Sequence, residues 1–120
     1  MASTSILLDV KKFLGDTFDG DDSFFDTSLL MAINMAVSEI AQNGGCRDDF
    51  TVEDESTTWD DLSSNAMLRN FAKAYICNQV KLEFDTPQNS ALKDQYTSKA
   101  AEALWRINIM VNPEENNVYG

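Results

Sequence analysis

The side chains of this 120-residue chain that could perform chemistry are its carboxylates and two cysteines, because the sequence contains no histidine. Histidine is the usual general base and the commonest metal ligand, so its absence excludes Ser–His catalytic triads and histidine-based zinc sites. Cys46 precedes Arg47, a cation that could activate a thiolate, but no further signal marks a reactive thiol. In a reducing compartment Cys46 and Cys77 are expected to remain free thiols.

The carboxylates would bind a cation only if their spacing matched a known loop. Residues 15–26 contain five aspartates, and Gly20 could serve as the glycine of an EF-hand. That alignment puts Gly15 at the first ligand position, where a side-chain oxygen is needed, so the pattern fails. A solvated acidic loop is the preferred interpretation, and a weak Ca²⁺ site is the alternative. The chain also lacks a Gly-rich phosphate loop and a Cys-X-X-Cys motif. We therefore predict a protein that is not an enzyme and has no cofactor or metal.

The net charge of −11 limits the partners of the chain. Such a charge opposes contact with a phosphate backbone, so no DNA binding by the free protein is expected. The acidity favours either simple solubility or a surface that lies near DNA without adhering to it. No apolar run approaches the roughly 20 residues that cross a bilayer, so no membrane contact is expected. The protein is predicted to be made and used in a cytoplasm.

The elements that must position these residues are helical. Apolar residues recur at helical spacing over residues 4–14, 27–43, 65–84 and 90–111, which predicts an all-α fold of four helices. Thr4 or Ser5 and Asp26 are the expected N-caps of the first two helices, and glycines or prolines follow each helical segment. The predicted organisation is one helical domain at residues 1–111 and a polar, extended tail at residues 112–120.

Residues 44–64 form a polar segment between the second and third expected helices. It is predicted to be a long acidic loop or a small β-hairpin, with residues 50–52 and 56–59 flanking an acidic turn. Seven of its residues are acidic, and Trp59 requires a surface against which to bury. We expect this segment and the tail to become ordered only in an assembly, because polar segments with isolated aromatics suit binding-coupled ordering.

Three helices carry a predicted core stripe and a distinct opposite face. The stripes are Leu29, Leu30, Ile33, Ala36, Val37, Ile40 and Ala41 in the second; Leu68, Phe71, Ala72, Tyr75, Ile76 and Val80 in the third; and Leu92, Tyr96, Ala100, Ala103, Leu104, Ile107 and Met110 in the fourth. The opposite face of the third helix is polar and mildly basic, with Lys73 and Lys81. Cys77 lies on that face and is therefore predicted to lie outside the ordinary core.

Two helices carry apolar residues on the side away from these stripes. Trp105 and Ile109 are one turn apart in the fourth helix, and Met31 and Met35 are placed similarly in the second. Trp and Met are enriched at contact surfaces, so the pairs predict an interface. The alternative is that all four pack inside one subunit under the long loop. In a head-to-tail ring, the acidic loops of one subunit could face the basic helix of the next. The alternative is that these acidic loops are simply solvated.

Five segments in fixed order resemble the small head–tail connector (adaptor or head completion) proteins of siphophages of Gram-positive hosts. They are residues 6–15, Phe25-Asp26-Thr27 through Asn34, Thr58-Trp59-Asp60-Asp61, Tyr75 through Leu82 with Phe84-Asp85 and Pro87, and Trp105-Arg106-Ile107-Asn108. The resemblance covers residues 6–108. The family often has a double proline where this chain has Thr86-Pro87, and residues 43–50 and those beyond 111 do not match.

The resemblance implies an all-helical virion protein that forms a ring of about twelve subunits under the portal, at the head–tail interface (the neck) of the particle. Such a ring extends the DNA conduit, lets genomic DNA pass without sequence-specific binding, and receives the stopper or tail completion protein. Assembly would take place in the host cytoplasm. The residues predicted to make subunit or portal contacts are Met31, Met35, Trp59, Lys73, Lys81, Trp105, Ile109 and Tyr119. The alternative function is an acidic helical DNA mimic or regulator-binding protein that acts as a monomer or dimer.

Overall fold

The computed structural model describes residues 4–15, 23–84 and 88–112. Within these residues the chain forms five helices, α1 (Ile6–Leu14), α2 (Ser23–Gln42), α3 (Trp59–Leu62), α4 (Ala66–Phe84) and α5 (Ser90–Val111), and no named strand. The predicted all-α class is confirmed, and the four long helices match the expected segments. The prediction of four helices is corrected by α3, a single turn too short to produce a periodic pattern.

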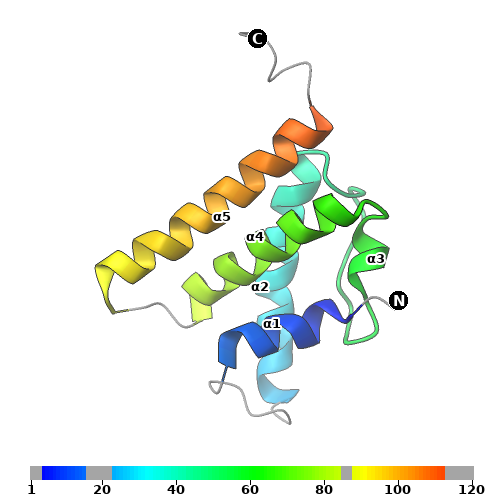
Figure 1. The fold of residues 1–120 in the computed structure, drawn as a ribbon. Helices are drawn as coiled ribbons and strands as arrows, with labels where there is room; N and C mark the ends of the chain where they lie inside the picture. Colours follow the sequence, from blue (N-terminus) through cyan, green and yellow to red (C-terminus); the bar gives the residue numbers. More distant parts are fainter. Residues whose placement is uncertain (1–3, 16–22, 85–87, 113–120) are drawn as a thin grey trace, which may run out of the picture.

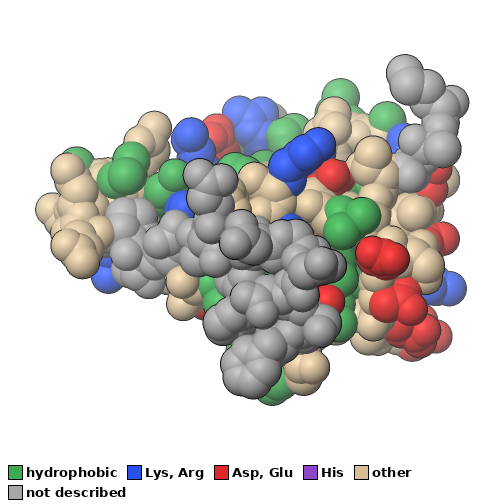
Figure 2. Space-filling view, turned by 90° about the horizontal axis from the view of Figure 1, so that it is seen from below, with side chains coloured by type: hydrophobic (Ala, Val, Ile, Leu, Met, Phe, Trp, Pro, Cys, Tyr) green, Lys and Arg blue, Asp and Glu red, His purple; other side chains and the backbone are tan. Residues whose placement is uncertain are grey.

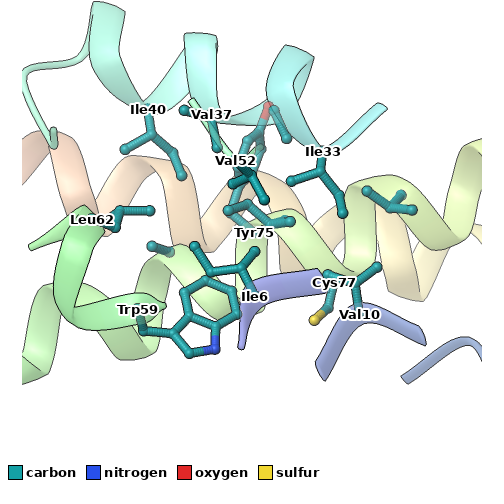
Figure 3. Packing of buried hydrophobic residues seen from close by; sticks show 14 of the residues in the cluster. Ile6, Val10, Ile33, Val37, Ile40, Val52, Trp59, Leu62, Tyr75 and Cys77 are labelled. Atoms are coloured by element: carbon teal, nitrogen blue, oxygen red, sulfur yellow. The ribbon is translucent and has the colours of Figure 1, made fainter. Parts of the chain in front are cut away.

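Helix α4 lies at the centre of the fold (Figure 1). Its longest contact is with α5, which runs beside it in the opposite direction, while α2 and α1 cross it elsewhere and α3 packs near its start. The core draws from all five helices and from the segment before α3, as Figure 3 shows for Ile6, Ile33, Val52, Trp59 and Tyr75. A central helix is buried on several sides, so its sequence cannot show one clean polar face.

The central position of α4 corrects the prediction for Cys77. This side chain is 2% exposed and belongs to the core, and the neighbouring Asn78 is also buried. The part of α4 that carries Cys77 and Asn78 is covered within the subunit, where α1 and α5 pack against this helix, while Lys73 remains exposed. Burial raises the pKa of the Cys77 thiol to about 12, so the thiol stays protonated and unreactive at neutral pH. Both cysteines are free, as expected.

The ends of α1 lie where the sequence predicted, whereas α2 begins earlier than predicted. Ser5 caps α1 by accepting a hydrogen bond from the Leu8 amide at 3.2 Å, and Gly15 ends the helix with a φ of +77°, as predicted. The prediction of Asp26 as the cap of α2 is wrong, because that helix begins at Ser23. Asp26 lies in the first turn instead, and its carboxylate pairs with Lys11 of α1 at 2.6 Å.

The turn after α2 fits closely against α5. Gly44 has a φ of +83°, and a Cβ atom on Gly45 would lie 2.6 Å from Ile40 Cγ2 and 2.8 Å from Ile107 Cγ2. Only glycine therefore fits at position 45 without moving the core. The side chain of Asn108 donates to the Asn43 side-chain oxygen at 2.8 Å, which adds a polar contact between α5 and the same turn.

The first half of α5 extends beyond the core, which corrects two expectations. Leu92 was predicted to belong to the core stripe of this helix, but it is exposed. Phe13 of α1, one of the apolar residues that recur at helical spacing in residues 4–14, is also exposed. The ring of Phe13 makes an edge-to-face contact with Tyr96 at a centroid distance of 6.4 Å, so α1 supports this half of α5 only lightly.

The segment between α2 and α3 is folded against the subunit. The Asn34 side chain accepts a hydrogen bond from the Val52 amide at 2.8 Å and donates to the Val52 carbonyl at 3.0 Å. Phe50 and Val52 are buried. The chain turns at Asp54, but no ladder joins the flanking residues, so the hairpin alternative is wrong. Phe50 and Val52 thus find apolar partners within their own subunit, while the expectation that the segment gains order only in an assembly stays a prediction.

Asn34→Ala is expected to destabilise the subunit by about 2–3 kcal/mol, because it leaves the buried amide and carbonyl of Val52 without partners. Urea unfolding measures the change. Ser38→Ala is the matched control, since the Ser38 hydroxyl only donates to the Asn34 carbonyl on the exposed side of α2. Equal stability of the Asn34→Ala and Ser38→Ala variants would contradict the anchoring role.

Candidate assembly surfaces

The outer face of α2 presents two exposed methionines above a hollow. Met31 and Met35 are each 66% exposed, as their position away from the core stripe predicted. Leu30 and Val52 line the same open groove, which has a volume of about 520 Å³. We call this surface, defined by Leu30, Met31, Met35 and Val52, the methionine groove. Flexible thioether side chains allow such a groove to adapt to an apolar partner.

The outer face of α5 presents an exposed indole. Trp105 is 55% exposed, which agrees with the helical angle that placed it opposite the core stripe. The Arg106 guanidinium lies 5.7 Å from the centre of its ring, within the range of a cation–π contact. Ile109 is partly buried and so points outward less than predicted. Trp105 and Ile109 together are called the tryptophan surface.

Trp59 is not part of any exposed surface. Its side chain is 5% exposed, and the indole nitrogen donates to Asp9 Oδ2 at 2.8 Å (the indole is labelled in Figure 3). The prediction that Trp59 contacts another subunit or the portal is therefore wrong. The reason is that α3 packs against α4 and that Trp59 is hydrogen-bonded to Thr4 and Asp9, so the indole is buried inside its own subunit.

Asp9 is the centre of the polar contacts beneath α3. It accepts hydrogen bonds from the Thr4 hydroxyl and the Trp59 indole, and the Lys73 ammonium lies 3.5 Å away. Burial by itself would raise the pKa of Asp9, but the two hydrogen bonds and the Lys73 charge outweigh it and hold the pKa below its ordinary value of 3.8. Lys73, predicted at an interface, is thus already paired inside the subunit. Lys81 is only partly exposed.

Acidification is expected to remove the stabilisation that Asp9 provides. A carboxylate whose folded pKa is depressed stabilises the fold above its unfolded pKa, and this contribution is lost as the pH falls below the ordinary value of 3.8 and through the folded pKa. Urea unfolding from about pH 6 to about pH 3 should therefore show a smaller loss for Asp9→Asn than for the parent chain. Asp94→Asn, at an exposed carboxylate on α5, is the control. Identical pH profiles for the Asp9→Asn variant and the parent would exclude this role.

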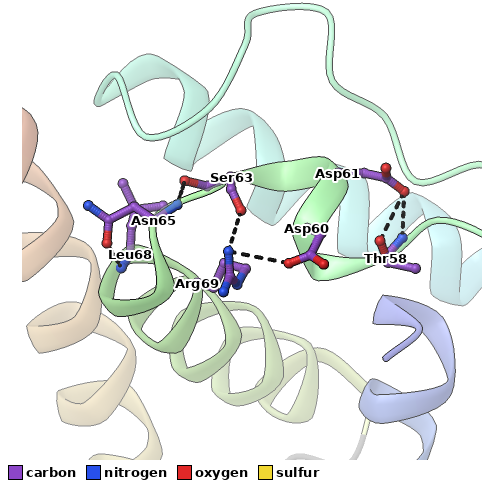
Figure 4. A network of polar contacts seen from close by, with 7 residues as sticks. All are labelled: Thr58, Asp60, Asp61, Ser63, Asn65, Leu68 and Arg69. Atoms are coloured by element: carbon purple, nitrogen blue, oxygen red, sulfur yellow. Dashed lines mark hydrogen bonds and ion pairs between the residues drawn. The ribbon is translucent and has the colours of Figure 1, made fainter. Parts of the chain in front are cut away.

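The acidic residues around α3 are divided between internal contacts and solvent. Arg69 of α4 donates to the Ser63 carbonyl at 2.9 Å and lies 3.3 Å from Asp60, while Asp61 accepts from the Thr58 amide at 2.9 Å (Figure 4). The turn at residues 53–55 keeps its three carboxylates exposed. Figure 2 shows acidic side chains gathered at one edge of the face it presents. The idea that these acids meet a free basic helix of a neighbour is weakened, because Arg69 and Lys73 are engaged internally.

None of the carboxylates and thiols of the described residues form a group of three or more that could hold a metal ion. Burial raises the pKa of Cys46 and outweighs the opposite effect of Arg47, so the thiol is not activated. Across the same residues no helix has the length and apolar character to cross a membrane. Tyr119 and the aspartates of residues 16–22 lie outside the described residues.

Three residues with structural roles were missed by the sequence reasoning. They are Asp9, Asn34 and Asn78, each a polar residue within a helix that otherwise presents apolar side chains. A polar residue next to a core stripe is a usable signal, because burial forces it to find hydrogen-bond partners. The identity of those partners depends on tertiary packing and was not accessible from spacing.

Comparison with known proteins identifies a family over most of the chain. A family model described as "Phage connector protein" matches residues 6–114, a range that includes all five helices. No curated protein and no solved structure matches the chain.

Proposed function

The chain belongs to the phage connector protein family, and from this premise we propose that it forms a ring between the portal and the stopper or tail completion protein of a phage particle. Membership of this family makes it a structural virion protein at the head–tail connection. The observation that carries the ring proposal is the presence of two unlike apolar surfaces, one on α2 and one on α5. Two unlike surfaces favour a head-to-tail contact that closes into a ring.

In this proposal the tryptophan surface of one subunit packs into the methionine groove of the next. An indole that enters a groove lined by Met31 and Met35 gains apolar burial and sulfur–aromatic contacts. The two surfaces lie on separate helices, α2 and α5, each of which packs against α4, so a subunit can use both at once. The resemblance of the sequence to head–tail connector proteins implies that the ring has about twelve subunits.

The charge of the subunit suits a conduit for DNA. Each chain carries a net charge of −11, and the exposed carboxylates of residues 53–55 lie on a turn that could face the lumen. A lumen with this charge repels the phosphate backbone, so the genome slides through without being held. The ring would occupy the neck of the virion and assemble in the host cytoplasm.

Incubation of the purified chain with its cognate portal tests the ring proposal. Negatively stained particles should show a second ring stacked on the portal, and sedimentation should show the chain moving with it. A chain that remains a monomer or dimer with saturating portal would overturn the proposal. That result would favour the acidic DNA-mimic alternative, particularly if the chain displaced DNA from a DNA-binding protein.

A further inference from the structure

A pocket with an acidic rim lies next to the methionine groove. It has a volume of about 440 Å³ and is lined by Leu7, Asp26, Leu30, Asp54, Glu55 and Ser56. Leu30 also lines the methionine groove, so the two hollows are adjacent. We call this second surface the acidic pocket. Leucines beside carboxylates suit a long basic side chain, whose aliphatic stem packs on the leucines while its charged end meets the carboxylates.

The acidic pocket presents two exposed carboxylates, those of Asp54 and Glu55. The third carboxylate, that of Asp26, pairs with Lys11 within the subunit at 2.6 Å. Asp54 is held in place by the Ser56 amide, which donates to its Oδ1 atom at 2.8 Å. A carboxylate that is already oriented loses less conformational freedom when it binds a cation. The pocket is therefore prepared for a basic side chain from outside the subunit.

The basic side chain that suits this pocket lies on α5 rather than on α4. On α4, Arg69 and Lys73 are engaged in ion pairs within the subunit. Arg106 of α5 is half exposed and pairs with Glu102 of the same helix at 3.4 Å. An exposed pair of this kind contributes little to stability, so Arg106 can exchange Glu102 for another carboxylate at small cost.

We propose that Arg106 of one subunit enters the acidic pocket of the next and pairs with Glu55 and Asp54, an inference that rests on the ring contact proposed above. The Arg106 guanidinium lies 5.7 Å from the centre of the Trp105 ring, so an indole in the methionine groove brings this cation with it. Val52 of the groove and Asp54 of the pocket are two residues apart, at most about 7 Å of extended chain. The two hollows are therefore close enough to receive adjacent side chains of one helix.

The ion pair gives the ring contact a fixed direction. Flexible methionines can accept an indole in more than one orientation, whereas a charged pair beside the groove fixes which way α5 runs across α2. Glu53 lies on the same turn as Asp54 but does not line the acidic pocket, so it can still face the lumen. The turn would then serve both the contact and the conduit.

Charge reversal in the full chain, assembled on its cognate portal, tests the pairing. Arg106→Glu and Glu55→Arg should each weaken co-sedimentation with the portal roughly tenfold or more, because like charges then meet at every contact. The chain that carries both substitutions should bind the portal within roughly threefold of the parent, since the pair is restored with its charges exchanged.

Lys93→Glu and Asp48→Arg are the matched controls. They make the same changes of charge at exposed positions outside both hollows and should leave binding unchanged. Each free variant should melt nearly as the parent does, because all four positions are exposed. Single reversals without effect, controls with an equal effect, or a double variant that is not rescued would overturn the pairing while the ring on the portal stands. A parent chain that forms no ring would overturn the proposed function and the pairing with it.

Discussion

Trp59→Ala is expected to destabilise the subunit by about 3–5 kcal/mol and to lower its melting temperature by more than roughly 10 °C. The indole is 5% exposed and packs in the core, so truncation creates a cavity. It also removes the indole N–H that donates a hydrogen bond to Asp9 Oδ2 at 2.8 Å. Thermal melting and urea unfolding of the free subunit measure the effect.

Trp59→Phe separates the two contributions. Phenylalanine keeps much of the apolar contact but cannot donate to Asp9, so we expect a smaller loss, about 1–3 kcal/mol. A Trp59→Ala loss below about 1 kcal/mol would mean that the indole is not a core side chain.

Trp105→Ala combined with Ile109→Ala is expected to prevent the chain from forming a ring on the portal while the free subunit melts almost as before. Trp105 is 55% exposed and Ile109 is only partly buried, so truncating both removes little from the core. A tryptophan at the centre of an interface can contribute about 2 kcal/mol or more, and a ring repeats that loss at every contact. Sedimentation with portal and thermal melting are measured on the same preparation. A large fall in the melting temperature would show that the tryptophan surface belongs to the core.

Two further variants make this test specific. Met67 is 59% exposed at the start of α4 and belongs to neither proposed surface, so Met67→Ala should leave assembly unchanged. Met31→Ala with Met35→Ala should reduce assembly as the tryptophan-surface variant does, because both remove the same contact from opposite sides. An assembly defect from Met67→Ala equal to the others would indicate a nonspecific loss of apolar surface.

The two tryptophans show what the sequence could and could not predict. Trp105 lies in a 22-residue helix whose periodicity sets the angle of every side chain, so its outward position followed from spacing. Trp59 begins a four-residue helix, too short for any period, and its partner Asp9 lies 50 residues earlier. Local patterns therefore predicted the first indole correctly and the second wrongly.

The same distinction separates the surfaces of α4 from those of α2. Helix α2 has one covered side, so its apolar stripe and its exposed methionines were both apparent from the sequence. Helix α4 meets four other helices, and the small or polar residues Cys77 and Asn78 are buried because neighbours cover them. The number of helices that pack around α4 depends on the whole fold, so it cannot be predicted from the sequence of that helix alone. For the proposed interface, spacing alone indicated Met31, Met35 and Trp105 but could not show that Trp59 is buried.

The joining of α1 to the segment before α3 has a consequence for how the subunit opens. The Ile6 amide donates to the Thr57 carbonyl at 3.1 Å, the Trp59 amide donates to the Thr4 carbonyl at 3.3 Å, and Ile6 and Val10 are fully buried. Terminal helices usually fray at little cost in free energy. Here fraying of α1 would uncover the centre of the core and separate α3 from its support. The first helix therefore belongs to the same cooperative unit as α4, and partial opening from that end is not a low-energy path to aggregation.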